Sequence, residues 1–184
     1  MAPHLDLNVI VVGEDRFTPA QATQVNDSLT VMTGIFAARG PVIGTVNRFR
    51  ITFADAGTLT IIRSLGDAQA LADRWSVKND ALDLFVVAVM SDPKADGWSP
   101  VGGPCDKRRT KGLRSPVVSL NGNAANSGNT FAHEVGHFLG LPHCEKDTSL
   151  CNDPVNFMKA SSNSNTSVTQ PQADRMRGHC SIRP

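Results

Sequence analysis

The sequence of 184 residues contains no tyrosine. A tyrosine hydroxyl is therefore excluded as an oxyanion donor or switchable ligand in any site that the chain forms. Excess charge is also missing, because the formal net charge is +1. A chain this close to neutrality has no strong field to attract nucleic acid or an anionic membrane. Long apolar runs are absent as well, and none approaches the roughly 20 residues of a membrane-spanning helix. We therefore expect no nucleic-acid partner and no membrane insertion.

The N-terminus lacks the charged and then apolar profile of a signal peptide, and no C-x-x-C pair suggests a zinc ribbon or a thioredoxin-like motif. The chain does contain four cysteines. An even number at scattered spacing favours two disulfides in an oxidising compartment, with four reduced thiols in a cytosolic protein as the alternative. Among the three pairings we favour Cys144–Cys151 and Cys105–Cys180, because the first closes a short loop. We expect a secreted, extracellular protein whose signal peptide and any pro-segment are not part of this chain.

The length favours one catalytic domain, 1–184, and we expect a monomer. Hydrophobic alternation and β-branched residues predict strands at 5–12, 46–53, 58–62, 81–90 and 116–122. Apolar residues at helical spacing predict helices at 18–40, 64–75 and 169–179, the first and last opened by Thr-x-x-Gln capping boxes. A further helix begins with Asn129 or Thr130 as its cap and ends near Gly140. This order predicts an α/β (α+β) fold with an upper lobe, 1–140, containing a twisted mixed sheet, and a small irregular lower lobe, 141–184, ending in a helix.

Several charged or polar residues have no specific motif around them. The basic run at 107–111 is predicted to be a solvated loop. Asp92 and Asp96 are candidate calcium ligands, but no spaced loop motif supports calcium binding. His4 and His179 lie at opposite ends of the chain. We predict that they are surface or packing histidines and form no second zinc site.

The stretch FAHEVGHFLGLPHCEKD, 131–147, holds three of the five histidines. His133 and His137 are four residues apart, so on a helix their imidazoles share one face and can share a metal ion. Glu134 follows His133, where its carboxylate can reach a water beside that ion. Gly140 allows a sharp turn that returns His143 toward the same point. The spacing predicts that His133, His137 and His143 are the metal ligands.

Three histidines with a fourth position left to water are typical of catalytic zinc. Such an ion lowers the pKa of water to about 7 and polarises a carbonyl, and Glu134 is then the predicted general base. Alternatives are a chance arrangement in a histidine-rich helix, a metal site without proteolytic activity, and Cys144 as a further ligand. The complete H-E-x-x-H-x-x-G-x-x-H spacing favours the zinc-protease hypothesis.

The segment HEVGHFLGLPH, together with a methionine turn placed at VNFMKA (155–160), resembles the metzincin clan of zinc endopeptidases. The Ser/Asn-rich stretch after Met158 and the last helix are most similar to pappalysin-like and bacterial secreted members. The resemblance implies a metzincin-like fold with the histidine helix in the cleft, and Met158 packed beneath the histidines without binding the metal. The sequence departs from the clan at Cys144, next to the third histidine.

We therefore predict a zinc metalloendopeptidase with Glu134 as the catalytic base and with Met158 and Gly140 supporting the site. The substrate is a protein or peptide that adds to an edge strand within 97–103 or 115–122. By resemblance, the Met158 segment and residues 159–168 form the wall of the pocket after the scissile bond. The alternatives are a zinc-dependent hydrolase of a non-peptide amide, and a catalytically silent metal-binding or toxin module. The presence of Glu134 argues against the silent module.

Overall fold

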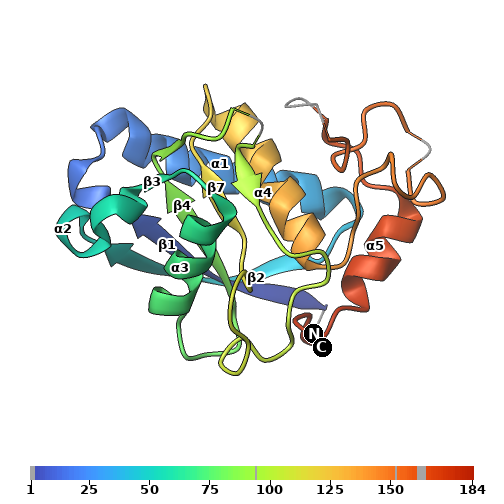
Figure 1. Cartoon of the computed structure of the whole chain (residues 1–184). Coiled ribbons are helices and arrows are strands. Elements are labelled where there is room, and N and C mark those ends of the chain that lie inside the picture. The colour runs from blue at the N-terminus through green and yellow to red at the C-terminus, as the bar shows by residue number, and fades with distance from the viewer. Residues whose placement is uncertain (1–2, 94, 152, 161–164) are drawn as a thin grey trace.

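The computed structural model describes residues 3–93, 95–151, 153–160 and 165–184. Figure 1 shows the arrangement of its helices and strands. The strands in these ranges are β1 (His4–Val12), β2 (Val42–Ile51), β3 (Ile61–Ile62), β4 (Leu82–Val87), β5 (Val89–Met90), β6 (Gly97–Trp98) and β7 (Val117–Ser119). The helices are α1 (Pro19–Arg39), α2 (Phe53–Ala56), α3 (Leu65–Trp75), α4 (Ala124–Phe138) and α5 (Gln170–Arg177), with 3-10 turns at Glu14–Arg16 and Gly57–Thr60.

Within the described ranges, the main sheet has the strand order β2-β1-β4-β7-β6. The pairs β1/β2, β1/β4 and β4/β7 are parallel, and β6 pairs antiparallel with β7. The predicted mixed sheet is confirmed. Of the two predicted edge segments, 97–103 contains the edge strand β6. The prediction of an edge at 115–122 is wrong, because β7 lies between β4 and β6.

Both faces of the sheet are covered by helices. Successive side chains of a strand point to opposite faces. Leu7 and Val9 of β1 belong to one hydrophobic cluster with residues of α1 and α4, whereas Ile10 and Val12 belong to a second cluster with residues of α3. Strand β4 is buried along its whole length, as its apolar sequence predicts for a central parallel strand. The histidine helix α4 therefore lies against the sheet on the same side as α1 (Figure 1).

The two predicted capping boxes are present. Thr18 accepts a hydrogen bond from the Gln21 backbone N–H, and the Gln21 side chain accepts one from the Thr18 backbone N–H. Thr169 and Gln172 repeat this arrangement at the start of α5. Each box satisfies backbone donors that have no partner inside the helix.

The predicted start of the histidine helix is wrong. Helix α4 begins at Ala124, and its cap is Asn123, whose side chain accepts from the backbone N–H of Asn126 at 3.0 Å. Packing against α1 explains the extra turn and a half. A Cβ at Gly128 would lie 2.5 Å from the Cβ of Val31, so α1 and α4 approach closely only because residue 128 is a glycine.

Four predicted strands have different bounds. The strand predicted at 116–122 is reduced to β7, Val117–Ser119. The strand predicted at 46–53 begins at Val42 and ends at Ile51, because Thr52 caps α2 with its side chain. The strand predicted at 58–62 is reduced to Ile61–Ile62, after a 3-10 turn. The strand predicted at 81–90 divides into β4 and β5, which lie in different sheets. The local sequence shows apolar content here but not these interruptions.

The prediction of a solvated basic loop at 107–111 is wrong for Lys107. Its side chain is buried, and its Nζ donates at 2.6 Å to both Asp83 Oδ1 and the backbone carbonyl of Ala81. Asp83 is fully buried on β4, and a buried carboxylate needs a partner of opposite charge. Arg108 and Arg109 are exposed and pair with Asp106.

Both favoured disulfides are confirmed: the bonds join Cys105 to Cys180 and Cys144 to Cys151. The first attaches the long 91–116 loop to the C-terminal segment.

His179 packs its ring against Phe138, and its Nε2 lies 3.1 Å from the carbonyl oxygen of Gly103, as expected of a packing histidine. The partly buried ring of His4 lies 3.8 Å from Asp6 Oδ1, and the backbone of His4 pairs with that of Arg183. Leu141 and Met158 share the hydrophobic cluster of α1 and α4. The division of the chain at residue 140 stays a prediction. Among the described residues, no helix combines the length and apolar character needed to cross a bilayer.

Candidate metal centre

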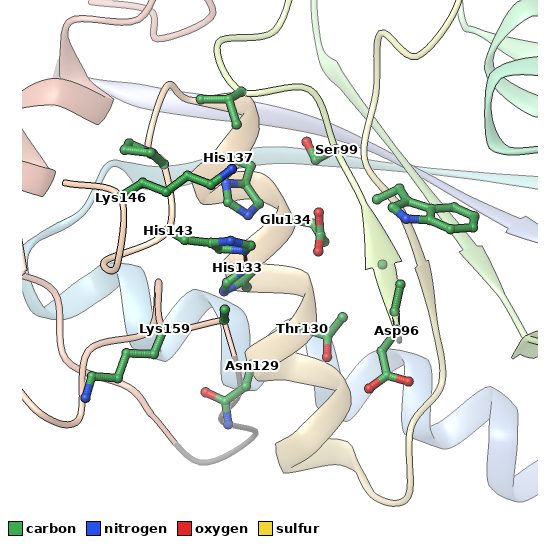
Figure 2. A pocket seen from close by; sticks show the side chains of 16 residues that line it. Asp96, Ser99, Asn129, Thr130, His133, Glu134, His137, His143, Lys146 and Lys159 are labelled. Carbon is green, nitrogen blue, oxygen red and sulfur yellow. Dashed lines mark hydrogen bonds between the residues drawn. The ribbon is translucent and has the colours of Figure 1, made fainter. Parts of the chain in front are cut away.

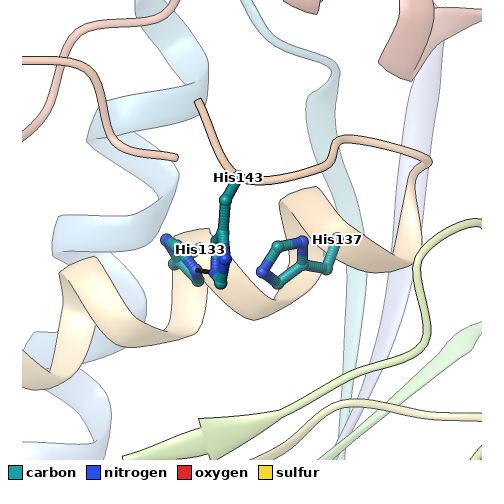
Figure 3. Close-up of side chains that lie close together, drawn as sticks. All are labelled: His133, His137 and His143. Atoms are coloured by element: carbon teal, nitrogen blue, oxygen red, sulfur yellow. Dashed lines mark hydrogen bonds between the residues drawn. The ribbon is translucent and has the colours of Figure 1, made fainter. Parts of the chain in front are cut away.

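The three histidines of the predicted motif converge on one point. His133 and His137 project from the same face of α4, and His143 returns from the segment that follows the helix (Figure 3). Gly140 makes this return possible with a φ of 98°, in the left-handed region that favours glycine. One nitrogen from each ring lies within 4.8 Å of the others. Within the described residues, no other three His, Cys, Asp or Glu side chains come together in this way, so Asp92 and Asp96 join no such cluster.

Backbone carbonyls fix the orientation of two of these rings. His133 Nδ1 lies 2.8 Å from the carbonyl oxygen of Phe157, and His137 Nδ1 lies 2.6 Å from that of Leu141. A carbonyl only accepts hydrogen bonds, so each Nδ1 carries the proton and donates it. The lone pair is left on Nε2, which faces the centre of the cluster. Such outer hydrogen bonds set the tautomer and direction of metal-binding histidines.

Burial lowers the pKa of all three histidines, to about 3 for His137. The imidazoles are therefore neutral at pH 7, which is the state that binds metal. His143 Nε2 lies 3.1 Å from His133 Nε2. Two nitrogens bound at about 2.0–2.1 Å to one tetrahedral zinc ion stand roughly 3.4 Å apart. The donor type, the tautomers and the spacing of this cluster fit zinc.

Glu134 lies between the histidines and the edge strand. Figure 2 shows its carboxylate on the side of α4 that faces the strand segment running from Asp96 to Ser99. The side chain is only 7% exposed, and burial raises its pKa to about 8. A Cβ at Gly97 would lie 2.5 Å from Glu134 Cγ and 2.9 Å from its Oε1. The carboxylate therefore occupies space that is open only because residue 97 is a glycine.

The histidines and Glu134 form part of the floor of a cleft of about 410 Å³. Edge strand β6 forms one wall, and the segment after α4 forms the other (Figure 2). Lys159 and Ala160 also line the cleft, at the start of the wall predicted at 159–168. Residues 161–164 of that predicted wall lie outside the described residues.

Met158 is fully buried and packs against the histidine helix at Gly136. A Cβ at Gly136 would lie 2.7 Å from Met158 Sδ and 2.8 Å from the ring of Phe157. The glycine between the two helical histidines thus admits the methionine turn. Met158 lies where the resemblance placed it, and Cys144 is held in a disulfide, so its thiolate is not available as the alternative ligand.

Asn156 holds the methionine turn in place, a role that no local sequence pattern indicates. Its side chain is fully buried and accepts from the backbone N–H of Met158 at 2.9 Å. The same amide exchanges two hydrogen bonds with Gln172 of α5, at 2.8 and 2.9 Å. Its oxygen also faces the sulfur of Cys144. Sequence reasoning likewise missed Gly97, whose contact depends on two segments about 35 residues apart.

Three features of the structure can be compared with known classes of protein: the mostly parallel mixed sheet, the helix that lies along the cleft and the convergent histidines. Together they fit a metzincin-like zinc metallopeptidase.

Comparisons with known proteins agree with this class. The family model "Metallo-peptidase family M12B Reprolysin-like" matches residues 55–144, a range that contains Glu134 and all three histidines. The fold is similar to archaemetzincin from Methanopyrus kandleri, with a TM-score of 0.59 and 16% identity over 95% of this chain and 94% of that one. It is also similar to a chain in a structure described as a chaperone-substrate complex, with a TM-score of 0.61 and 16% identity over 94% of this chain and 31% of that one. A comparison with curated protein sequences found no match. At this identity, the structural likenesses establish the fold.

Proposed function

We propose that this protein is a zinc endopeptidase that hydrolyses peptide bonds with Glu134 as general base. The observation that carries the proposal is the position of the Glu134 carboxylate, in the cleft between the histidine cluster and the edge strand. A family model of metallopeptidases that spans the site supports the same activity. His133, His137 and His143 would hold the ion. When bound, zinc supplies an activated water and polarises the substrate carbonyl.

Glu134 takes a proton from the attacking water and returns it to the leaving amine. A general base works best when its pKa is near the working pH. Burial alone raises the pKa of Glu134 to about 8, and a nearby divalent cation would lower it toward neutrality. With a pKa near neutrality, Glu134 can both accept the proton from water and donate it to the leaving amine.

The edge strand favours a peptide over other amides. Strand β6 pairs with β7 on one side and forms the edge of the sheet on the other. An extended peptide can add to such an edge through main-chain hydrogen bonds, with its side chains directed alternately to either face. Its scissile carbonyl would then lie over the histidine cluster. We further propose that the protein is secreted and monomeric. Two disulfides among the described residues support the secreted location.

A digest of a proteome-derived peptide library tests the proposal. Metal-free protein, the same protein with one equivalent of zinc, and the zinc-loaded protein with a chelator are compared by mass spectrometry. We expect internal cleavage of peptides with zinc alone. An aryl amide is tested as a second substrate under the same three conditions. Its hydrolysis without any peptide cleavage would instead support the non-peptide amidase. Zinc binding with neither activity would support the silent metal-binding module.

A further inference from the structure

The cleft has an uneven distribution of charge. Apart from the histidines, its charged lining residues are Glu134 on the floor, Asp96 on the edge-strand side, and Lys146 and Lys159 on the opposite wall. Figure 2 shows the ammonium group of Lys146 reaching over the C-terminal end of the histidine helix, beside His137. In the same view Asp96 lies near Thr130, toward the other end of the helix.

The backbone fixes where Lys146 can reach. Its N–H donates to the carbonyl of His143 at 2.9 Å, which forms a turn directly after the third histidine. The Lys146 side chain lines the same cleft as His137 and His143. Lys146 thus stands at the metal centre without being one of its ligands.

The side chain of Lys146 is exposed and forms no hydrogen bond or ion pair with any described residue. The two acids next to it in the sequence form no ion pair with it. Asp147 is paired with Arg175 at 3.8 Å, and Glu145 does not line the cleft. An unpaired cation at the edge of a binding cleft attracts a carboxylate on the ligand and repels a cation.

We infer that Lys146 selects peptides with an aspartate or glutamate on the N-terminal side of the scissile bond. This inference rests on the proposed endopeptidase function. Strand β6 runs from the Asp96 end of the cleft toward Ser99, which lies at the Lys146 end (Figure 2). Antiparallel pairing is the more stable form of strand addition. A peptide paired antiparallel with β6 therefore has its N-terminal side at the Lys146 end. At the other end of the cleft Asp96 and Lys159 carry opposite charges (Figure 2).

Matched peptides that differ only by glutamate or glutamine before the cleaved bond test this selection. Their kcat/KM values are measured with the zinc-loaded protein. Their Kd values are measured by fluorescence anisotropy with the zinc-loaded Glu134→Ala variant, which is expected to bind without cleaving. An exposed ion pair corresponds to a preference of up to about fivefold. We expect glutamate to be favoured by about this factor in both measurements, and the preference to decrease as salt is raised.

Charge-reversal variants assign the preference to a residue. In Lys146→Glu, we expect the glutamate preference to disappear and a lysine peptide to be favoured instead. Lys78→Glu is the matched control, because Lys78 is exposed, lies outside the cleft and undergoes the same change in charge. We expect this control to keep the glutamate preference.

Equal kcat/KM and Kd values for the two peptides would overturn the inference. A preference for acidic residues only on the C-terminal side of the cleaved bond would also overturn it. The same holds if Lys159→Glu reverses the glutamate preference and Lys146→Glu does not. If no peptide is cleaved at all, the proposed function fails. The binding measurement then still decides whether Lys146 selects a carboxylate.

Discussion

Gly97 is predicted to control catalysis without touching the metal. In a Gly97→Ala variant the new Cβ would lie 2.5 Å from Glu134 Cγ and 2.9 Å from both its Cδ and Oε1, whereas ordinary contacts begin near 3.4 Å. The carboxylate must therefore move by about 1 Å, and such a misplacement of a catalytic group costs roughly a hundredfold in rate. This factor corresponds to about 2.7 kcal/mol in the activation free energy.

The Gly97→Ala variant is tested with a quenched fluorescent peptide and, separately, by zinc competition against a chromophoric chelator. We expect kcat to fall roughly a hundredfold while zinc affinity stays within about threefold, because the three atoms nearest to the new Cβ all belong to Glu134. Gly34→Ala is the matched control. A Cβ there meets nothing within 4 Å, so activity should be unchanged and the helix slightly stabilised. Full activity in Gly97→Ala, or a loss of zinc affinity parallel to the loss of activity, would contradict this prediction.

Three further predictions follow from the same site. Gly136→Ala should lower the unfolding free energy by about 1–3 kcal/mol and weaken zinc binding, because the methionine turn must move; unchanged zinc affinity in a chelator titration would count against this. In metal-free protein, the stability of the wild type relative to Glu134→Gln should fall as pH rises from 4.5 to about 8. In this pH range the folded state keeps the Glu134 proton that the unfolded chain releases, so the free energy of unfolding falls by about 1.4 kcal/mol for each pKa unit of the shift. Urea unfolding that shows a pH-independent stability difference between the two proteins would contradict this. Replacing Cys144 and Cys151 by serine should lower the free energy of unfolding by about 2–3 kcal/mol and also weaken zinc binding through His143. Removal of the Cys105–Cys180 disulfide should reduce stability and leave zinc affinity unchanged.

The sequence predicted best those features whose cause is local. The capping boxes at Thr18 and Thr169 depend on residues three positions apart, and both are present. The convergence of the three histidines depends on helical spacing and on the turn at Gly140, which also lies within one short segment. The disulfide Cys144–Cys151 was favoured because it closes a short loop, which left Cys105–Cys180 as the second pair, and both are confirmed.

Features that depend on distant contacts were missed or placed wrongly. The first turns of α4 are polar and contain Gly128, so their helical propensity is weak. They form because Gly128 lets α1 approach and because the Ser127 hydroxyl accepts from Gln24 at 3.0 Å. Lys107 belonged to a run that resembles a solvated loop, and only the fold reveals its partner Asp83.

The same limit applies to the support of the site. Asn156 lies in a segment without periodicity, and its role depends on Gln172 and on the methionine turn. Gly97 was one of several glycines in a long loop. Its importance follows from a single contact with Glu134 across the cleft. Such positions are set by tertiary packing, which a local sequence pattern does not encode.

The role proposed for Glu134 is that of a base beside a zinc ion that it does not hold. Its most direct test is to measure zinc content and peptide cleavage together in the Glu134→Ala variant. We predict about one zinc per chain in both wild type and variant. Cleavage should fall by at least about a hundredfold in the variant. Cleavage at the wild-type rate, or loss of the zinc together with the activity, would contradict the role proposed for Glu134.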